Sequence, residues 1–380
     1  MGDIMFSKTE KILDSFLPMG VPGYDFIVFK DGKCIFRKMG GYSNLEEKIQ
    51  MTGNERYNIY SCSKLITCVA ALKLYEEGMF CFDDKLYDYI PEYKEIFLRG
   101  ENGLQKSDKD ILIRHLFNMT AGFSYNLNQK SITDCRNDTN GRCETLKQIK
   151  YMAKDAVNFK AGEAWAYSLC HDVLAALVEV VSGERFGEYV RKNIFGPLGM
   201  SRSTFLLPEN ELDTICEQYI FDDSSKTAKN CGKQIMYYKF GSMYESGGAG
   251  AISTVEDYIK LLEALRTGTI LKSETVDLML CDCLDEKLRK YYFYPDYGYG
   301  LGVRTPMPDM GTTDFGWGGA AGAYWAIDRQ NGISMYYAQH MLNSPNKQER
   351  YMLYATLKED LFGTAQKSDF ALDSKLSQYV

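Results

Sequence analysis

The chain has 380 residues, and at about 150 residues per domain this length predicts two or three structural units. Hydrophobic residues make up 45% of the sequence and charged residues 25%, a mixture that is typical of globular proteins and excludes a largely disordered chain. The net charge is −7 and no long basic block is present, so we expect no nucleic-acid partner, because phosphate binding depends on clustered Lys and Arg.

The sequence also argues against a membrane protein and against a metal enzyme. No apolar run approaches the roughly 20 residues that a membrane span needs, and residues 1–20 lack the basic–apolar–small pattern of a signal peptide. The 11 cysteines are scattered and odd in number, and only three histidines are present. We therefore expect a cytoplasmic protein with reduced, mostly buried thiols, no membrane partner, no metal site and no organic cofactor.

The N-terminal region begins with a helical pattern and continues as a β-hairpin. Residues 8–16 show the helical pattern, and residues 24–30 and 33–39 are two β-type runs. Asp31 and Gly32, which lie between the two runs, are a strong signal for a two-residue hairpin turn.

The middle of the chain is mostly helical in pattern. Residues 62–77, 171–181 and 254–265 are expected to form helices, because apolar residues recur in them at helical spacing. Gly78 and Gly183 follow the first two patterns as C-terminal stop signals.

Two polar stretches and a second sheet-type region complete the chain. Residues 125–142 and 221–233 are polar, and we expect each to be an exposed loop or insertion. Residues 324–327 and 333–339 are aromatic and β-branched runs joined by a turn-rich segment, and residues 347–361 show a final helical pattern.

Sheet-type sequence therefore lies near both ends of the chain, and ends that pair would build one antiparallel sheet. The predicted fold class is α/β (α+β), with a central antiparallel sheet flanked by helices and an inserted, mainly helical domain. We expect residues 1–60 and 240–380 to form the α/β domain and residues 61–239 the helical domain, with the active site in the cleft between them. The oligomeric state stays open.

A Ser-x-x-Lys arrangement opens the helical pattern at residues 62–77. Ser61 and Lys64 are three residues apart, nearly one helical turn, so the amine lies beside the hydroxyl on one face. The backbone N–H of Ser61, at the helix start, could stabilise an oxyanion. The pattern alone is weak, since Ser61 could simply cap the helix and Ser344 to Lys347 matches it too, in a Pro-containing turn.

The context of Ser61 is more specific than the motif. Residues 60–67, an apolar helix and Asp83-Asp84-Lys85-Leu86 resemble the serine β-lactamase-like superfamily, which includes class C β-lactamases, DD-peptidases and related family VIII carboxylesterases. The likeness continues, in the family's order, through the segments 111–116, 120–123, 161–168, 181–183, 197–200, 248–254, 297–302 and 315–319. It runs from about residue 10 to about residue 360 and implies a β-lactamase/DD-peptidase-like fold.

The resemblance implies three active-site elements. Ser61 matches the nucleophile, Lys64 the lysine of the first motif, and Tyr167 the tyrosine of the Tyr-x-Asn motif. The third element, usually Lys-Thr-Gly on an edge strand, falls on Trp317, Gly318 and Gly319. Tyr167 could instead be one core aromatic residue among many, and the segment at Trp317 could be no more than the tight start of a strand.

Two departures from the family pattern bear on the substrate. Leu169 replaces the asparagine of Tyr-x-Asn, which in relatives touches the lysine and the amide of the substrate. Trp317 replaces the lysine of Lys-Thr-Gly, which helps to hold a substrate carboxylate; losing that cation removes an interaction typically worth about 1.5–3 kcal/mol. An indole face favours apolar acyl groups, so the departures favour esters over penicillins or D-Ala-D-Ala peptides.

The expected function is hydrolysis of small carboxylic esters through an acyl-enzyme, with at most weak β-lactamase activity. Lys64, Tyr167 or both would take the proton of Ser61, and the backbone N–H groups of Ser61 and Ala320 would hold the oxyanion. The alternatives are an acyltransferase, an amide or D-amino-acid peptidase, or a β-lactamase that uses the same site. A catalytically idle binding protein on this fold is a further alternative.

Overall fold

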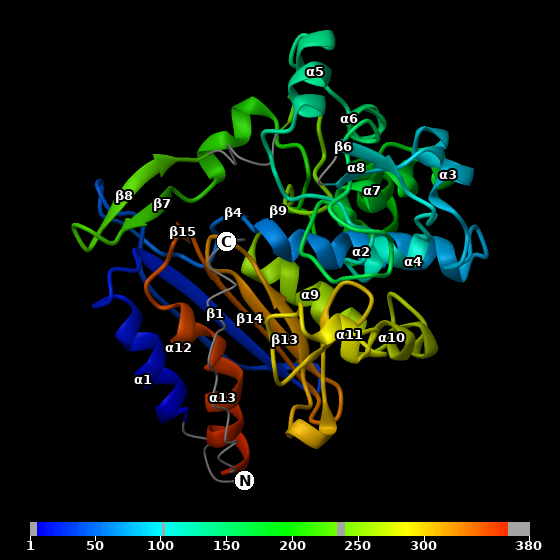
Figure 1. Cartoon of the computed structure of the whole chain (residues 1–380). Coiled ribbons are helices and arrows are strands. Elements are labelled where there is room, and N and C mark those ends of the chain that lie inside the picture. The colour runs from blue at the N-terminus through cyan, green and yellow to red at the C-terminus, as the bar shows by residue number, and fades with distance from the viewer. Residues whose placement is uncertain (1–5, 101–102, 234–239, 364–380) are drawn as a thin grey trace.

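An antiparallel sheet of eight strands forms the centre of the molecule in this computed structural model, which describes residues 6–100, 103–233 and 240–363 (Figure 1). The strand order is β10-β11-β12-β13-β14-β1-β2-β3. The bounds are β1 Gly23–Lys30, β2 Lys33–Asn44, β3 Ile49–Gln50, β10 Gly298–Tyr299, β11 Arg304–Thr305, β12 Phe315–Gly318, β13 Tyr324–Asp328 and β14 Ile333–Gln339. All neighbouring strands in this sheet are antiparallel, as the fold class predicts.

Strands from the N-terminal and C-terminal parts of the chain pair in the middle of this sheet. Strand β1 pairs with β2 on one side and with β14 on the other, so that Tyr24 lies opposite Gln339. Asp31 and Gly32 both have positive φ angles, 49° and 81°, which is the backbone that a type I′ hairpin turn requires. The predicted pairing of the terminal hairpins in one sheet is therefore present.

Helices cover both faces of the sheet. Successive residues of β14 point to opposite faces, so two neighbouring side chains of this strand contact different helices. On one face, Tyr336 stacks on Tyr258 of helix α9 (Val255–Arg266), with ring centroids 4.4 Å apart. On the other face, Tyr337 meets Phe16 of helix α1 (Ser7–Phe16) at 5.5 Å.

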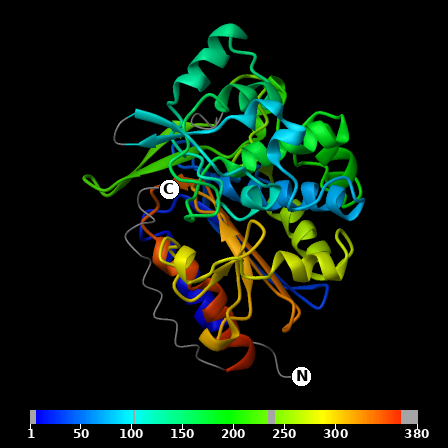
Figure 2. The ribbon, with the colours of Figure 1, turned by 45° about the vertical axis from the view of Figure 1, so that its right-hand side comes forward.

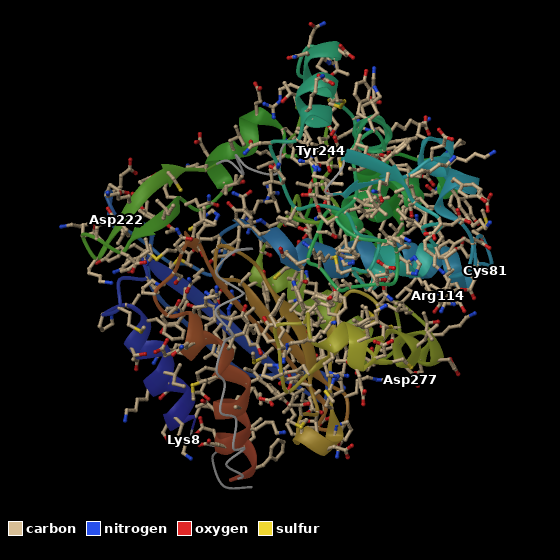
Figure 3. The ribbon with its side chains drawn as sticks, in the orientation of Figure 1. Lys8, Cys81, Arg114, Asp222, Tyr244 and Asp277 are labelled. Atoms are coloured by element: carbon tan, nitrogen blue, oxygen red, sulfur yellow. A yellow bond between two sulfur atoms is a disulfide. The ribbon has the colours of Figure 1, made fainter. Side chains whose placement is uncertain are left out.

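Helix α13 (Leu353–Phe362) lies beside α1, to which an ion pair between Lys8 and Glu359 joins it (Figures 2 and 3). The single helix expected over 347–361 is two helices, α12 (Lys347–Tyr351) and α13, which meet at Met352.

A mainly helical part, drawn at the top of Figure 1, is built around the buried helices α2 (Ser63–Glu76) and α7 (Cys170–Ser182). The other helices of this part are α3 Leu86–Tyr89, α4 Ile113–Phe117, α5 Lys130–Asp138, α6 Thr145–Met152 and α8 Phe186–Val190. Helices α10 (Ser273–Met279) and α11 (Glu286–Arg289) follow α9. The helices predicted at 62–77, 171–181 and 254–265 thus match α2, α7 and α9 to within a residue or so at each end.

The prediction that residues 125–142 and 221–233 are loops is wrong in both cases. The first stretch contains α5, which buries Ser131, Ile132 and Cys135 and leaves its other residues at least partly exposed to solvent. The second stretch contains most of a hairpin, β7 (Gln218–Asp222) and β8 (Thr227–Gly232), which projects from the left side of Figure 1. Polar composition in both places reflects one exposed face rather than missing secondary structure.

The cysteines also differ from expectation. Cys135 and Cys143 form a disulfide, so these two residues are not reduced thiols. Of the nine free cysteines, only Cys62, Cys68, Cys170 and Cys216 are buried. The expectation of reduced thiols therefore holds for nine of the eleven cysteines and is wrong for the Cys135–Cys143 pair, and the free thiols are not mostly buried.

Three smaller pairings join the sheet to the rest of the molecule. Strand β4 (Tyr57–Asn58) pairs with β9 (Ile252–Ser253), and β7 pairs in parallel with β15 (Met341–Leu342). Strands β5 (Phe97–Gly100) and β6 (Gly103–Lys106) form a separate hairpin. In the described part of the chain, no helix is long and apolar enough to cross a membrane.

The division of the chain into two domains at residues 60 and 240 stays a prediction. All eight strands of the large sheet come from residues 23–50 and 298–339, which fits that division. Residues 1–5 and 364–380 of the predicted α/β domain lie outside the described residues.

Replacing Asp314 with Ala should strongly destabilise the sheet beside β12. Arg304 on β11 is 1% exposed and donates to Asp314 at 2.5 Å, so the substitution leaves a buried charge without its partner. We expect the free energy of unfolding to fall by about 3–5 kcal/mol in urea denaturation. Asp223→Ala, which breaks an exposed ion pair with Lys226, is the matched control and should leave stability unchanged.

Candidate active site

Ser61 lies in a tight turn between strand β4 and helix α2. The turn is a 3-10 helix over Tyr60–Cys62, and Tyr60 adopts a φ of 46°, which is rare for a bulky residue and marks a strained backbone. The Tyr60 hydroxyl donates to Gln218 at 2.7 Å, and the N–H of Ile59 donates to the carbonyl of Ala251 at 3.1 Å. These contacts hold the turn that presents the Ser61 side chain, which is 8% exposed.

Two side chains converge on the Ser61 hydroxyl. Lys64 Nζ donates to Ser61 Oγ at 3.2 Å, and the Tyr167 hydroxyl donates to the same atom at 2.6 Å. Lys64 is fully buried, and its Nζ also donates to the carbonyl oxygen of Gly248 at 2.7 Å. The structure thus brings together the three residues to which the sequence assigned catalytic roles.

The electrostatics around Tyr167 favour its neutral form in the resting site. Burial raises the pKa of Tyr167 above its ordinary value, and the hydrogen bonds with Ser61 and Trp317 only partly counter this. Lys64 Nζ lies 4.5 Å from the centroid of the Tyr167 ring, so the amine faces the phenol as well as the serine. Ser61 Oγ is therefore in hydrogen-bond contact with both groups that could take part in moving its proton.

Trp317 lies on β12 and faces Tyr167. Its indole Nε1 donates to the Tyr167 hydroxyl at 3.4 Å, and the two rings stack with centroids 5.8 Å apart. Trp317 is 5% exposed. An indole therefore occupies the place that the sequence comparison gave to a lysine, and it touches the same tyrosine that touches Ser61.

The two glycines after Trp317 bring the end of β12 close to the nucleophile turn. A Cβ on Gly319 would collide with the carbonyl oxygen of Ile59, so only glycine allows this approach. The N–H of Gly319 already donates to Ala323, whereas Gly318 pairs with Tyr324 in the sheet. Ala320, the next residue, is the predicted second oxyanion donor.

A backbone carbonyl contacts Lys64 where relatives use the side chain of an asparagine. Leu169, which stands where relatives have an asparagine, is buried at the start of α7 and brings no amide to Lys64. The carbonyl of Gly248 accepts from Lys64 instead. A backbone oxygen from a distant loop thus orients the lysine here.

Tyr125 is a residue of the site that sequence reasoning missed. It lies in the irregular segment before α5, at the start of the polar stretch 125–142. Its ring stacks on Tyr167 at 5.2 Å, and Lys64 Nζ lies 5.8 Å from its centroid. The segment has no periodic pattern, so only its position after residues 120–123 could have singled it out.

Aromatic rings form one wall beside the nucleophile. Phe293 lies 5.9 Å from Trp317 and 6.4 Å from Tyr167, and Trp165 and Tyr299 pack against the same group. All of these side chains are buried. The surroundings of Trp317 are therefore apolar, as an acyl group without charge would require.

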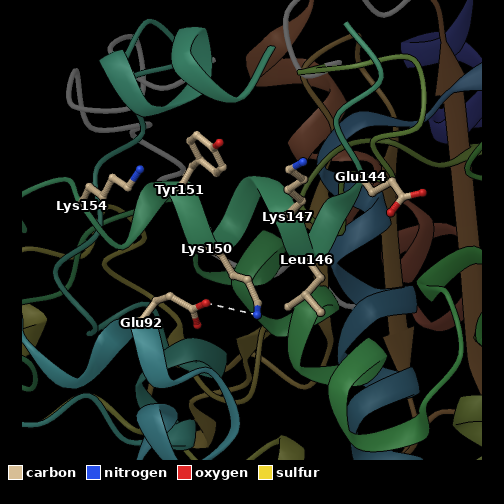
Figure 4. Close-up of a pocket in the computed structure, with 7 residues that line it drawn as sticks. All are labelled: Glu92, Glu144, Leu146, Lys147, Lys150, Tyr151 and Lys154. Atoms are coloured by element: carbon tan, nitrogen blue, oxygen red, sulfur yellow. Dashed lines mark ion pairs between the residues drawn. The ribbon is translucent and has the colours of Figure 1, made fainter. Parts of the chain in front are cut away.

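Other candidate features lie away from Ser61. Within the described residues, no three His, Cys, Asp or Glu side chains gather into a metal-ligand set. Ser344, in the second Ser-x-x-Lys match, accepts from Gln339 and donates to Asn346 in a turn, so its hydroxyl is engaged there. A surface pocket along α6 is lined by lysines and glutamates, with Lys150 paired to Glu92 (Figure 4), and none of the predicted site residues lines it.

Known proteins resemble this chain over most of its length. It is 26% identical over 333 residues to the esterase EstB of Burkholderia gladioli, covering 81% of this chain and 83% of that protein. It is also 26% identical over 276 residues to ML-236A carboxylate methylbutanoyltransferase mlcH of Penicillium citrinum, covering 68% of this chain and 64% of that protein.

A solved structure shares the fold. EstCE1, described as a hydrolase with promiscuous acyltransferase activity, superposes with a TM-score of 0.77 at 22% identity and covers 94% of this chain and 98% of that one. The profile of the family described as Beta-lactamase matches residues 13–358, which include every predicted site residue. With Ser61, Lys64 and Tyr167 in mutual contact inside that match, the chain belongs to the Beta-lactamase family.

Proposed function

We propose that this protein is a serine hydrolase that acts on small carboxylic esters through an acyl-enzyme on Ser61. The observation that carries the proposal is the double contact of Ser61 Oγ with Lys64 and with Tyr167. A hydroxyl in this position can lose its proton to a neighbour without a histidine, which is what a serine nucleophile needs. The likeness to EstB and to EstCE1 supports an enzyme of this class.

In the first step, Ser61 Oγ attacks the carbonyl carbon of the ester while its proton passes to the neutral amine of Lys64. The transfer is direct, or it runs through Tyr167, whose oxygen takes the Ser61 proton as its own proton moves to Lys64. Because burial holds Tyr167 neutral at rest, we assign it as a proton carrier rather than a resting phenolate. The negative oxygen of the tetrahedral intermediate would accept from the N–H groups of Ser61 and Ala320. Tyr167 then gives a proton to the departing alcohol, which leaves the acyl group on Ser61.

In the second step, water replaces the alcohol. It attacks the acyl carbon, loses a proton to the same Lys64–Tyr167 pair, and releases the carboxylic acid as Ser61 regains its hydrogen. An alcohol in place of water would give acyl transfer with the same residues. The likeness to the transferase mlcH favours this as the second candidate activity.

Esters are the preferred substrate class because of the wall around Trp317. A carboxylate-bearing substrate would meet an indole and Phe293 where a lysine would otherwise stand. A charge placed there would lose water without gaining a partner, whereas an apolar acyl group gains contact area. We therefore propose weak β-lactamase activity at most, and a small-molecule ester or amide as the binding partner.

Ser61→Ala should abolish ester turnover and covalent labelling by a fluorophosphonate probe, because it removes the only atom that the acyl group would bond to. The fold should persist, as circular dichroism would show. Ser344→Ala is the matched control and should retain full activity and labelling. An unlabelled but active wild-type protein would contradict the proposal, and a wild type that is neither labelled nor active would favour a binding protein.

Lys64→Ala and Tyr167→Phe should each lower kcat for a p-nitrophenyl ester by about 100- to 10,000-fold. The double variant should lose little more than the worse single variant, because the two groups act as one proton-transfer unit. Steady-state kinetics on all four proteins test this. Independent, multiplying losses would show that the two side chains serve different steps.

Trp317→Lys should shift the preference of the enzyme toward substrates that bear a carboxylate. A restored charge-assisted contact, at about 1.5–3 kcal/mol, corresponds to roughly a 10- to 100-fold gain in kcat/KM for nitrocefin relative to an ester. Ester activity should fall, because the new ammonium lies against apolar groups. A wild type that already cleaves nitrocefin as efficiently as its best ester would instead be a β-lactamase.

A further inference from the structure

Asp172 is a buried carboxylate that the catalytic steps above do not use. It lies in the first turn of α7, five residues after Tyr167, and is 1% exposed. Its Oδ1 accepts from the hydroxyl of Tyr244 at 2.7 Å and from that of Ser246 at 2.6 Å. Tyr244 is labelled within the helical part of the molecule in Figure 3. A carboxylate that is shielded from water loses its hydration, so the protein has to supply the interactions that stabilise its charge.

The residue that connects Asp172 to the catalytic lysine is Gly248. The carbonyl oxygen of Gly248 accepts from Lys64 Nζ at 2.7 Å, and the backbone of Gly248 lies close enough to the Asp172 carboxylate to lower its pKa. A Cβ on Gly248 would lie 3.6 Å from Lys64 Nζ and closer still to Asp172 Oδ2. The two ionisable side chains thus lie against the same side of one glycine.

The loop around Gly248 is tied down at several points. Thr67 of α2 donates to the carbonyl of Gly247 at 2.7 Å, and the N–H of Ala249 donates to Ser246 at 3.0 Å. Thr67 of α2 and Asp172 of α7 therefore both hold the loop by hydrogen bonds. A carbonyl in so constrained a loop can fix the direction in which a flexible lysine points.

We propose that Asp172 is a positioning residue and the counter-charge of Lys64. Its carboxylate offsets the ammonium that Lys64 becomes when it takes the Ser61 proton and, through Gly248, aims Nζ at Ser61 Oγ. A fully buried cation is costly unless an opposite charge lies near it, and Asp172 faces it from the neighbouring helix. This inference rests on the proposed function, because it assigns a role to a group that serves Lys64.

The other titratable groups that face this pair are not carboxylates. His171, the neighbour of Asp172 on α7, has a pKa lowered to about 3 by burial and is neutral. Burial raises the pKa values of the Cys68 and Cys170 thiols, which are neutral too.

The phenols that face the pair are Tyr244 on the side of Asp172 and Tyr167 and Tyr125 on the side of Lys64. Burial raises the pKa values of Tyr244 and Tyr167, which keeps both phenols neutral. Burial also raises the pKa of Asp172, while the Ser246 and Tyr244 hydroxyls and Lys64 act in the opposite direction.

Asp172→Asn is the direct test, because it keeps the shape and an acceptor oxygen but removes the charge. We expect kcat for a p-nitrophenyl ester to fall at least 10-fold with little change in KM. The limb of the pH profile of kcat/KM that reports proton loss from Lys64 should move to lower pH by about 1–2 units, as loss of a nearby opposite charge requires. An unchanged profile would overturn the proposal, whatever the loss in rate.

Asp257→Asn is the matched control. Asp257 is also buried, accepts from Ser203 and pairs with a lysine, but its lysine is Lys260 at 3.0 Å. This variant should lower the melting temperature and leave the pH profile of the enzyme unchanged. A similar shift in both variants would show a general effect of buried charge and would contradict a specific role for Asp172.

A second variant keeps the proposal testable if Asp172→Asn does not fold. Tyr244→Phe combined with Ser246→Ala removes two donors, so the Asp172 carboxylate should take up a proton at higher pH. As the pH falls, kcat should then drop toward the level of Asp172→Asn at a higher pH than in the wild type, and a wild-type dependence of kcat on pH would overturn the inference. Fluorophosphonate labelling of wild-type Ser61 separates the two proposals, since a labelled, active wild type with unmoved variants refutes the role of Asp172 alone.

Discussion

The burial of the Lys64 side chain against Ser61 is the constraint on which the site depends. A fully buried amine cannot be solvated, so every polar contact that it makes has to come from the protein. Ser61 Oγ and the carbonyl of Gly248 provide two of these contacts at 3.2 and 2.7 Å. The lysine therefore has one well-defined direction, and that direction ends on the hydroxyl that would become the nucleophile.

Holding that geometry requires strain and close approach elsewhere. Tyr60 takes a positive φ so that the chain can turn sharply from β4 into α2, and its hydroxyl is fixed by Gln218. Gly319 lets the end of β12 reach the carbonyl of Ile59 without a clash. The sheet thus serves as a rigid support that sets the distance between the nucleophile turn and the Trp317 strand. Such support is what a preorganised site needs, because small displacements of reacting groups are costly.

The aromatic wall and the polar cluster divide the surroundings of Ser61 into two different environments. Trp317 and Phe293 present ring faces and edges, which suit an apolar acyl group. On the other side, Lys64 is backed by Gly248 and, beyond it, by the Asp172 carboxylate. An apolar side for binding and a polar side for proton transfer come from different residues, so a substitution on one side can leave the other unchanged.

Part of this structure could be predicted from short sequence patterns, because turns and helices depend on residues that are close together in the chain. The Asp31–Gly32 turn, the two terminal hairpins and the helices α2, α7 and α9 follow from patterns that span a few residues. Ser61 and Lys64 share a helix face because three residues are nearly one turn. Tyr167 could be placed in the site only through its position in an ordered family pattern, since it lies 106 residues from Ser61.

The tertiary structure alone decided the remaining features. Tyr125, Phe293 and Gly248 reach the site from segments without a periodic signal, and their contacts span long stretches of chain. The Cys135–Cys143 disulfide could not be predicted either, because the spacing of cysteines in the sequence does not tell which thiols meet. Sequence patterns report which face of an element is buried. Which loop lies against that face depends on how distant elements pack, and here that packing determined what holds the lysine and what lines the wall beside the serine.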